Sequence, residues 1–119
     1  MKYKIIQGYV HASAPKGLIG ANIKFPKISV GATENLIIAA SMAKGKTTLL
    51  NCAIEPEIKD LVNFLIKLGC NIKWTSKRTV KIVGVTSVKE INYKIMPDRI
   101  EAGTYLVAAA LTEGKLRVT

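Results

Sequence analysis

The 119-residue sequence has few of the residues that would indicate a metal centre, a disulfide framework or a membrane span. It contains two cysteines and one histidine, His11, and neither cysteine has a second cysteine nearby, so no metal site is expected. The longest near-apolar run, residues 36–43, is far too short to cross a bilayer, and the stretch MKYKIIQGYV lacks the apolar region of a secretory signal. We therefore expect a cytoplasmic protein, with Cys52 and Cys70 as buried thiols.

Negative charge is also scarce, because 8 acidic residues stand against 18 basic ones and the formal net charge is +10. Such a charge favours anionic partners, namely phosphate-bearing small molecules, nucleic acid or an acidic surface. The basic residues are scattered, so a solvated basic surface is the plain alternative. Aromatic residues make up only 6% of the chain and no known nucleic-acid-binding signature is present, which weakens the reading as a nucleic-acid-binding module.

Hydrophobic periodicity and turn residues predict a mixed α/β chain. An apolar helix is expected over residues 32–43, and an amphipathic helix is expected to begin at Pro56 and stop at Gly69. A third helix, apolar again, opens with Asp98 and Glu101 in a capping-box pattern. Strands are predicted over residues 2–6, 9–13, 19–25, 47–52, 72–75, 80–85, 92–96 and 116–119.

The two apolar helices belong to an internal repeat with an offset of 69 residues. Ala39 aligns with Ala108, and Gly45 aligns with Gly114. The repeated unit is strand, apolar helix, strand, amphipathic helix, strand, strand. Because a helix that is apolar on every side must be enclosed and one unit cannot enclose it, several units are expected to assemble.

Three sequence motifs resemble the family of enolpyruvyl transferases that act on UDP-N-acetylglucosamine, the UDP-N-acetylglucosamine 1-carboxyvinyltransferases. The motifs are K-x-S-V-G-A-T-x-N, E-P-E-I-x-D-L-x-x-F-L-x-x-L-G and P-D-R-I-E-x-G-T, in this order over most of the chain. The sister family that transfers enolpyruvyl to shikimate phosphate shares the fold, but the S-V-G-A-T and P-D-R-I-E-x-G-T strings favour the UDP-sugar enzyme.

The resemblance implies an inside-out α/β barrel built from βαβαββ units with internal apolar helices and external sheets. It further implies that residues 1–96 form the latter part of one enolpyruvyl transferase domain, with one full unit. Residues 97–119 would open the next unit, in the second domain.

The resemblance also implies the chemistry, which is transfer of the enolpyruvyl group of phosphoenolpyruvate to the 3'-hydroxyl of UDP-N-acetylglucosamine. Both substrates are small molecules, no cofactor is involved, and no nucleic acid or membrane partner is expected. The family's loop cysteine has no counterpart here, since neither Cys52 nor Cys70 has its glycine-rich setting, so no catalytic residue is assigned and the isolated chain is expected to be inactive.

Carried over residue by residue, the resemblance assigns the nucleotide-sugar contact to Lys27, Ile28, Ser29, Val30 and Gly31. The chemistry is sensible, because a diphosphate requires a cation and hydrogen-bond donors. Lys27 supplies the charge and Ser29 a hydroxyl, while the two following amides stand at a helix N-terminus, which favours anions. The plain alternative is a surface lysine beside a serine that only caps the helix.

Acidic helix starts are also implied to lie by the cleft between the domains. Glu55 opens the amphipathic helix, and Asp98, Arg99 and Glu101 open the second apolar one. Capping and dipole compensation are the simpler roles for the three carboxylates, and the two roles can coexist. A structural fragment that only self-associates, through the exposed faces of an incomplete barrel, remains a further alternative.

Overall fold

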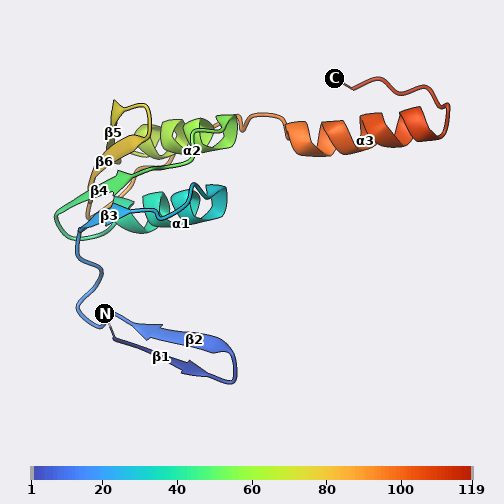
Figure 1. The fold of residues 1–119 in the computed structure, drawn as a ribbon. Helices are drawn as coiled ribbons and strands as arrows, with labels where there is room; N and C mark the ends of the chain where they lie inside the picture. The colour runs from blue at the N-terminus through green and yellow to red at the C-terminus, as the bar shows by residue number, and fades with distance from the viewer. Residues whose placement is uncertain (1, 119) are drawn as a thin grey trace.

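A computed structural model describes residues 2–118. Along this part of the chain the strands and helices alternate in the predicted α/β manner, with one separate hairpin at the start (Figure 1). The strands are β1 (Lys2–Ile6), β2 (Tyr9–Ser13), β3 (Asn22–Lys24), β4 (Lys46–Leu50), β5 (Asn71–Ser76) and β6 (Thr79–Val83). The helices are α1 (Val30–Ser41), α2 (Pro56–Lys67) and α3 (Arg99–Leu111).

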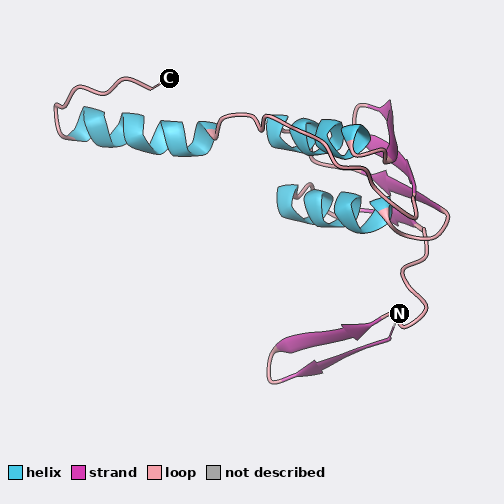
Figure 2. Cartoon of the chain, turned by 180° about the vertical axis from the view of Figure 1, so that it is seen from behind, coloured by secondary structure: helices cyan, strands magenta, loops and turns pink. Residues whose placement is uncertain are grey.

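The central body is a four-stranded sheet with strand order β3-β4-β6-β5. β3 is parallel to β4, and β6 is antiparallel to both of its neighbours. Helices α1 and α2 lie side by side on one face of this sheet (Figures 1 and 2). The element order β3-α1-β4-α2-β5-β6 confirms the predicted βαβαββ unit.

The core forms where the sheet meets the two helices. Alternate residues of the inner strands are buried, among them Leu49 of β4 and Ile82 of β6, as expected for a sheet covered on one face. Ile37 of α1 and Ile58 of α2 are completely buried in the same core. Each such side chain contributes about 1.5–3 kcal/mol through the area removed from water. The apolar stripe predicted for α2 is confirmed by its buried residues Ile58, Val62 and Leu65.

Both cysteines lie in this core as free thiols, as predicted. Burial raises the pKa of the Cys52 thiol above its usual value, partly offset by backbone hydrogen bonds. A buried thiol with a raised pKa is a poor nucleophile, which agrees with a packing role.

Helix α1 is covered on one side only. It begins at Val30, because Ser29 caps its N-terminus, and it ends at Ser41, so that both ends lie two residues earlier than predicted. Ile37 is fully buried against the sheet and α2, whereas Ile38 and Met42 on the other side are 51% and 54% exposed. Within the described residues the apolar helix is therefore only half enclosed.

The hairpin β1–β2 stands apart from the central body, connected by residues 14–21 (Figure 1). Its turn uses Gln7 and Gly8, both with positive φ, as a tight hairpin turn requires. All ten of its strand residues are exposed, including Tyr3 and Val10.

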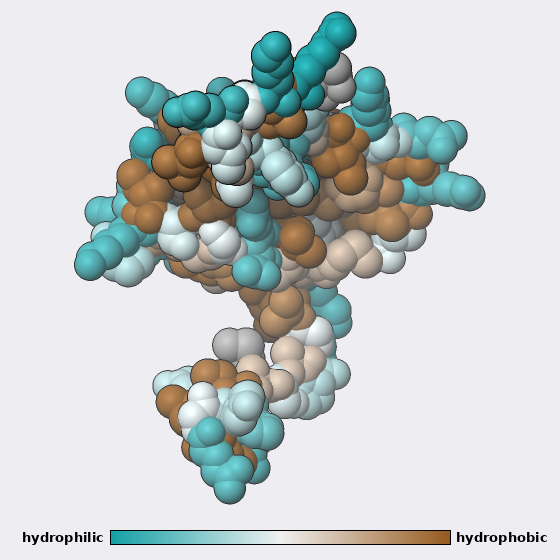
Figure 3. Space-filling model, turned by 90° about the vertical axis from the view of Figure 1, so that its right-hand side faces the viewer, coloured by the Kyte–Doolittle hydropathy of each residue, from teal (hydrophilic) through white to brown (hydrophobic). Residues whose placement is uncertain are grey.

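Helix α3 extends away from the central body, and it has no buried residue. The chain accordingly has a radius of gyration of 18.0 Å, against about 13.5 Å for a compact domain of this length. No helix among the described residues is long and apolar enough to span a bilayer. Figure 3, viewed from the side towards which α3 extends, shows apolar side chains on the upper part of the molecule and on the hairpin below it.

Two predicted strands do not form. Residues 92–96 run along α2 instead, where the Tyr93 hydroxyl donates to the Asp60 carboxylate over 2.8 Å. Side-chain contacts with a helix have replaced backbone pairing with a strand. Residues 116–118 also lack strand structure, since no described strand lies beside them to accept their hydrogen bonds, and Thr119 lies outside the described residues.

The predicted repeat appears in the positions of the two apolar helices. They begin at residues 30 and 99, an offset of 69, and each has a capping side chain directly before it. Ser29 accepts from one backbone N–H and Asp98 accepts from two. The two segments therefore share local structure, although within residues 2–118 α1 packs against a sheet and α3 does not.

Candidate functional site

The start of α1 is built around Ser29. This residue is extended (φ −143°, ψ 125°), and its Oγ accepts the backbone N–H of Ala32 over 3.3 Å. The serine hydroxyl keeps its own proton and can donate to a ligand while it caps the helix. Capping and ligand contact are therefore compatible at this residue.

Thr33 fastens this helix start to the loop before α2. Its side chain is completely buried, and its Oγ1 donates to the Ser29 carbonyl oxygen over 2.7 Å. The same Oγ1 accepts the backbone N–H of Ala53 over 3.0 Å. We call this pair of bonds the Thr33 bridge. It fixes the Ser29 backbone relative to the loop that leads to Glu55.

The first amides of α1, from Val30 and Gly31, have no intrahelical acceptor, and no described residue accepts from them. A β-carbon at Gly31 would meet nothing within 4 Å, so the chain's own packing does not require glycine there. Lys27 and Ile28 precede the cap and are exposed. The five residues Lys27–Gly31 therefore form an open, exposed ledge at a helix N-terminus.

A groove of about 670 Å³ lies between α2, the segment before α3 and the start of α3. Val30 contributes to its edge, which places one residue of the ledge on the groove. Its lining is largely apolar: Leu61 and Phe64 come from α2, and Met96 and Ile100 come from the chain opposite. Tyr93 packs edge-to-face on Phe64, with ring centroids 5.3 Å apart.

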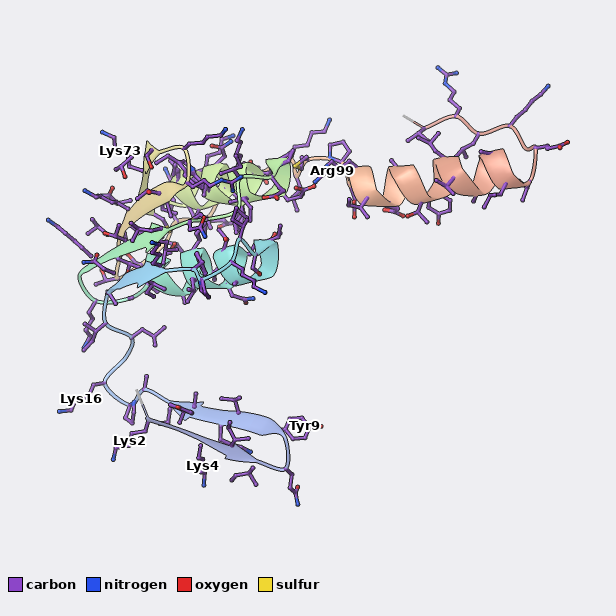
Figure 4. The ribbon with its side chains drawn as sticks, in the orientation of Figure 1. Lys2, Lys4, Tyr9, Lys16, Lys73 and Arg99 are labelled. Carbon is purple, nitrogen blue, oxygen red and sulfur yellow. The ribbon has the colours of Figure 1, made fainter. Side chains whose placement is uncertain are left out.

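Acidic side chains surround this groove. Four carboxylates line it, from Glu55, Glu57, Asp60 and Asp98, against the single guanidinium of Arg99. Arg99 lies where the central body joins α3 (Figure 4), and its Nε donates to Glu57 Oε1 over 2.7 Å. This hydrogen bond from Arg99 lowers the pKa of Glu57. The hydrogen bond to Asp60 raises the pKa of the Tyr93 hydroxyl.

Only some of the predicted site residues meet at the groove. Val30, Glu55, Asp98 and Arg99 line it, whereas Glu101 lines a separate, shallow pocket on α3. The remaining residues predicted to contact the nucleotide sugar, Lys27, Ile28, Ser29 and Gly31, lie outside the groove on the exposed ledge. Glu55 does not cap α2 with its side chain, because Oε2 accepts the Ile54 N–H over 2.7 Å instead.

Sequence reasoning missed Glu57, Asp60 and Tyr93 as groove residues. Both carboxylates lie on α2, for which the sequence indicates an ordinary amphipathic helix, and Tyr93 falls in the strand predicted over residues 92–96. No local signal pairs Asp60 with a residue 33 positions later. Among residues 2–118, no three His, Cys, Asp or Glu side chains gather closely enough to hold a metal ion.

The βαβαββ unit followed by a second capped apolar helix matches the fold of the enolpyruvyl transferases. The sequence profile of the family EPSP synthase (3-phosphoshikimate 1-carboxyvinyltransferase) matches residues 2–119, and the chain belongs to this family. The enolpyruvyl transferase NikO from Streptomyces tendae superposes with a TM-score of 0.75. That superposition covers 91% of this chain and 28% of NikO at 21% identity, and it supports the fold alone.

Among curated proteins, the chain is similar to UDP-N-acetylglucosamine 1-carboxyvinyltransferases. It is 82% identical to that of Pelagibacter ubique over 119 residues, which are 100% of this chain and 28% of the relative. It is 53% identical to that of Beijerinckia indica over 113 residues, 95% of this chain and 26% of the relative. The chain thus spans about a quarter of the length of these relatives.

Proposed function

We propose that this chain is part of an enolpyruvyl transferase that acts on UDP-N-acetylglucosamine. The reaction moves the enolpyruvyl group of phosphoenolpyruvate to the sugar 3'-hydroxyl and releases phosphate. It is the first committed step of peptidoglycan precursor synthesis and so serves cell-wall biogenesis in the cytoplasm. The observation that carries the proposal is the 82% identity with the Pelagibacter ubique protein over all 119 residues.

In this proposal the ledge Lys27–Gly31 contacts the nucleotide sugar. Lys27 would neutralise diphosphate charge, and the Ser29 hydroxyl and the following two amides would donate hydrogen bonds. The open space around Gly31 supports close approach of a ligand to the backbone. The acidic groove does not suit a diphosphate, and it borders the ledge only through Val30.

We further propose that a domain boundary lies at Pro97. In this reading residues 1–96 complete one domain, and residues 97–119 begin the next unit. The absence of any buried residue in α3 supports it, because an apolar helix of this kind is expected to pack on a sheet of its own unit. Glu55, Asp98, Arg99 and Glu101 would then lie close to the cleft between the domains.

The proposed site is tested by titrating the chain with UDP-N-acetylglucosamine and following backbone amide chemical shifts. We expect shifts at residues 28–32 that are lost in Lys27→Ala and retained in the matched control Lys16→Ala, another exposed lysine. No shift at these residues would reject the ledge as a working site in this chain. Phosphate release from phosphoenolpyruvate is expected to be absent, since no catalytic residue is assigned, and turnover would contradict that expectation.

Self-association is a second candidate property, favoured by the exposed apolar residues of α3. Tyr105, Val107 and Leu111 are 58%, 59% and 80% exposed. Apolar surface of this kind commonly marks an interface. Sedimentation velocity is expected to show concentration-dependent size, which Leu111→Glu should reduce, whereas a strictly monomeric chain at all concentrations would contradict this property.

A further inference from the structure

The outer face of the four-stranded sheet, turned away from α1 and α2, carries one lysine from every strand. These are Lys24 of β3, Lys46 of β4, Lys81 of β6 and Lys73 of β5. All four are exposed. In Figure 4, Lys73 lies at the sheet side of the molecule, away from Arg99 and α3. We call this set the lysine face.

Strand register places the four side chains on the same side. Lys81 is paired with Thr48 on one neighbouring strand and with Lys73 on the other. Lys46 lies two residues before Thr48, so it shares that side of β4. Lys24 is paired with Leu50, two residues after Thr48, and completes the set.

Neutral residues fill the rest of this face. Among the described residues the one ion pair is that of Glu57 and Arg99, far from the sheet's outer side, so no carboxylate neutralises the four lysines. The other positions on this side of the strands are Asn22, Thr48, Leu50, Asn71, Ser76, Thr79 and Val83.

This arrangement costs stability, since like charges directly opposite each other on neighbouring strands repel. Lys73 and Lys81 are such a pair. Lysine on an edge strand can protect against edge-to-edge aggregation, which would account for Lys73 on β5 and Lys24 on β3. It does not account for Lys46 and Lys81, because β4 and β6 are the inner strands.

We propose that the lysine face is a docking surface for anionic lipid headgroups at a membrane surface. The face presents lysine rather than arginine, which suits diffuse attraction to many phosphates more than bidentate recognition of one group. It carries no aromatic side chain on which a nucleic acid base could stack, and Trp74 of β5 points to the opposite, helix-covered side. Clusters of about four to eight basic residues that lie beside a membrane are attracted to its anionic lipids.

The proposal does not depend on the UDP-sugar reaction. It departs from the sequence-based expectation of no membrane partner, because the four lysines are scattered in the sequence and meet only in the sheet. A peripheral contact of this kind requires no membrane-spanning helix and is compatible with a protein of the cytoplasm.

The test compares two variants of equal net charge. One carries Lys24→Gln, Lys46→Gln, Lys73→Gln and Lys81→Gln. The matched control carries Lys16→Gln, Lys59→Gln, Lys94→Gln and Lys115→Gln, which are exposed lysines outside the face. Both sets alter only exposed side chains, so circular dichroism should confirm that both variants fold. Binding is measured by co-sedimentation with vesicles of phosphatidylcholine alone and of phosphatidylcholine mixed equally with phosphatidylglycerol.

We expect the unmodified chain and the control to bind only the phosphatidylglycerol vesicles, more weakly as salt is raised. The face variant should bind at least tenfold more weakly than the control, because each lysine near an anionic surface strengthens association about fivefold. Equal vesicle binding by both variants, or none by the unmodified chain, would overturn the proposal. Duplex DNA and polyglutamate serve as competing anionic partners. If the unmodified chain binds either of them more tightly than vesicles, and only the face variant loses this binding, the lipid proposal is overturned in favour of a nucleic-acid or acidic-protein partner.

Discussion

Helices α1 and α3 start from the same sequence pattern and reach different environments. Each follows a capping side chain and is predominantly apolar, and their starts are 69 residues apart. In α1, four residues are buried, whereas in α3 none is. The comparison shows that capping and composition determine where these helices begin, while a neighbouring sheet determines whether their apolar side chains stabilise the chain.

The largest expected difference between the helices is in their apolar side chains. Ile37→Ala should lower the free energy of unfolding by about 2–5 kcal/mol, because it leaves a cavity in the core. Leu106→Ala in α3, where the side chain is 52% exposed, should change it by no more than about 0.5 kcal/mol. Urea denaturation measures both, and equal losses would mean that α3 is packed in solution.

A second comparison concerns two threonines that donate to a backbone carbonyl. Thr33→Val removes the Thr33 bridge and leaves the buried Ala53 N–H without its acceptor, at a cost of about 1–3 kcal/mol. The control Thr104→Val removes an exposed bond to Ile100 in α3 and should have little effect on stability. Thr33→Ser retains the hydroxyl and should restore the bond. Thermal unfolding distinguishes the three variants, and similar melting temperatures for Thr33→Val and Thr104→Val would contradict the bridge.

The smallest expected effect is at the junction between the central body and α3, and it depends on pH. Since the folded-state pKa of Glu57 is lowered by Arg99, the ion pair contributes fully above the ordinary carboxylate pKa of about 4.3. It is lost as the pH falls through the lowered value. NMR titration of Arg99 Nε–H should show this change, and Glu57→Gln should abolish it. An unchanged Arg99 signal down to strongly acid pH would show that the pair does not form in solution.

Helix periodicity and helix caps could be predicted because the residues that produce them are close together in the sequence. The spacing of the apolar residues Ile58, Leu61, Val62 and Leu65 predicts the amphipathic helix α2, and Asp98 predicts a helix cap, each from a few neighbouring residues. The failed strand at residues 92–96 was different, since β-branched and aromatic residues there suit a strand, but Tyr93 instead bonds to Asp60 across 33 positions. Side-chain contacts over such a separation leave no periodic signal.

In the candidate site, too, the local geometry was predictable and the long-range contacts were not. The motif around Lys27–Gly31 falls on one helix start, and Ser29 caps that helix as its residue type suggests. The groove was not predictable as a whole, because it needs α2, the segment around Tyr93 and the start of α3 to meet. Arg99 was recognised as a candidate, but its partner Glu57 was not.

Residue order alone was sufficient to establish the presence and order of the helices, the repeat and the family, because capping, periodicity and motifs act over neighbouring positions. The tertiary structure alone decided that one side of α1 is buried while α3 has no buried residue. It also decided that four lysines scattered in the sequence share one face of the sheet. Burial and charge density depend on which distant segments become neighbours, and that is a property of packing in three dimensions.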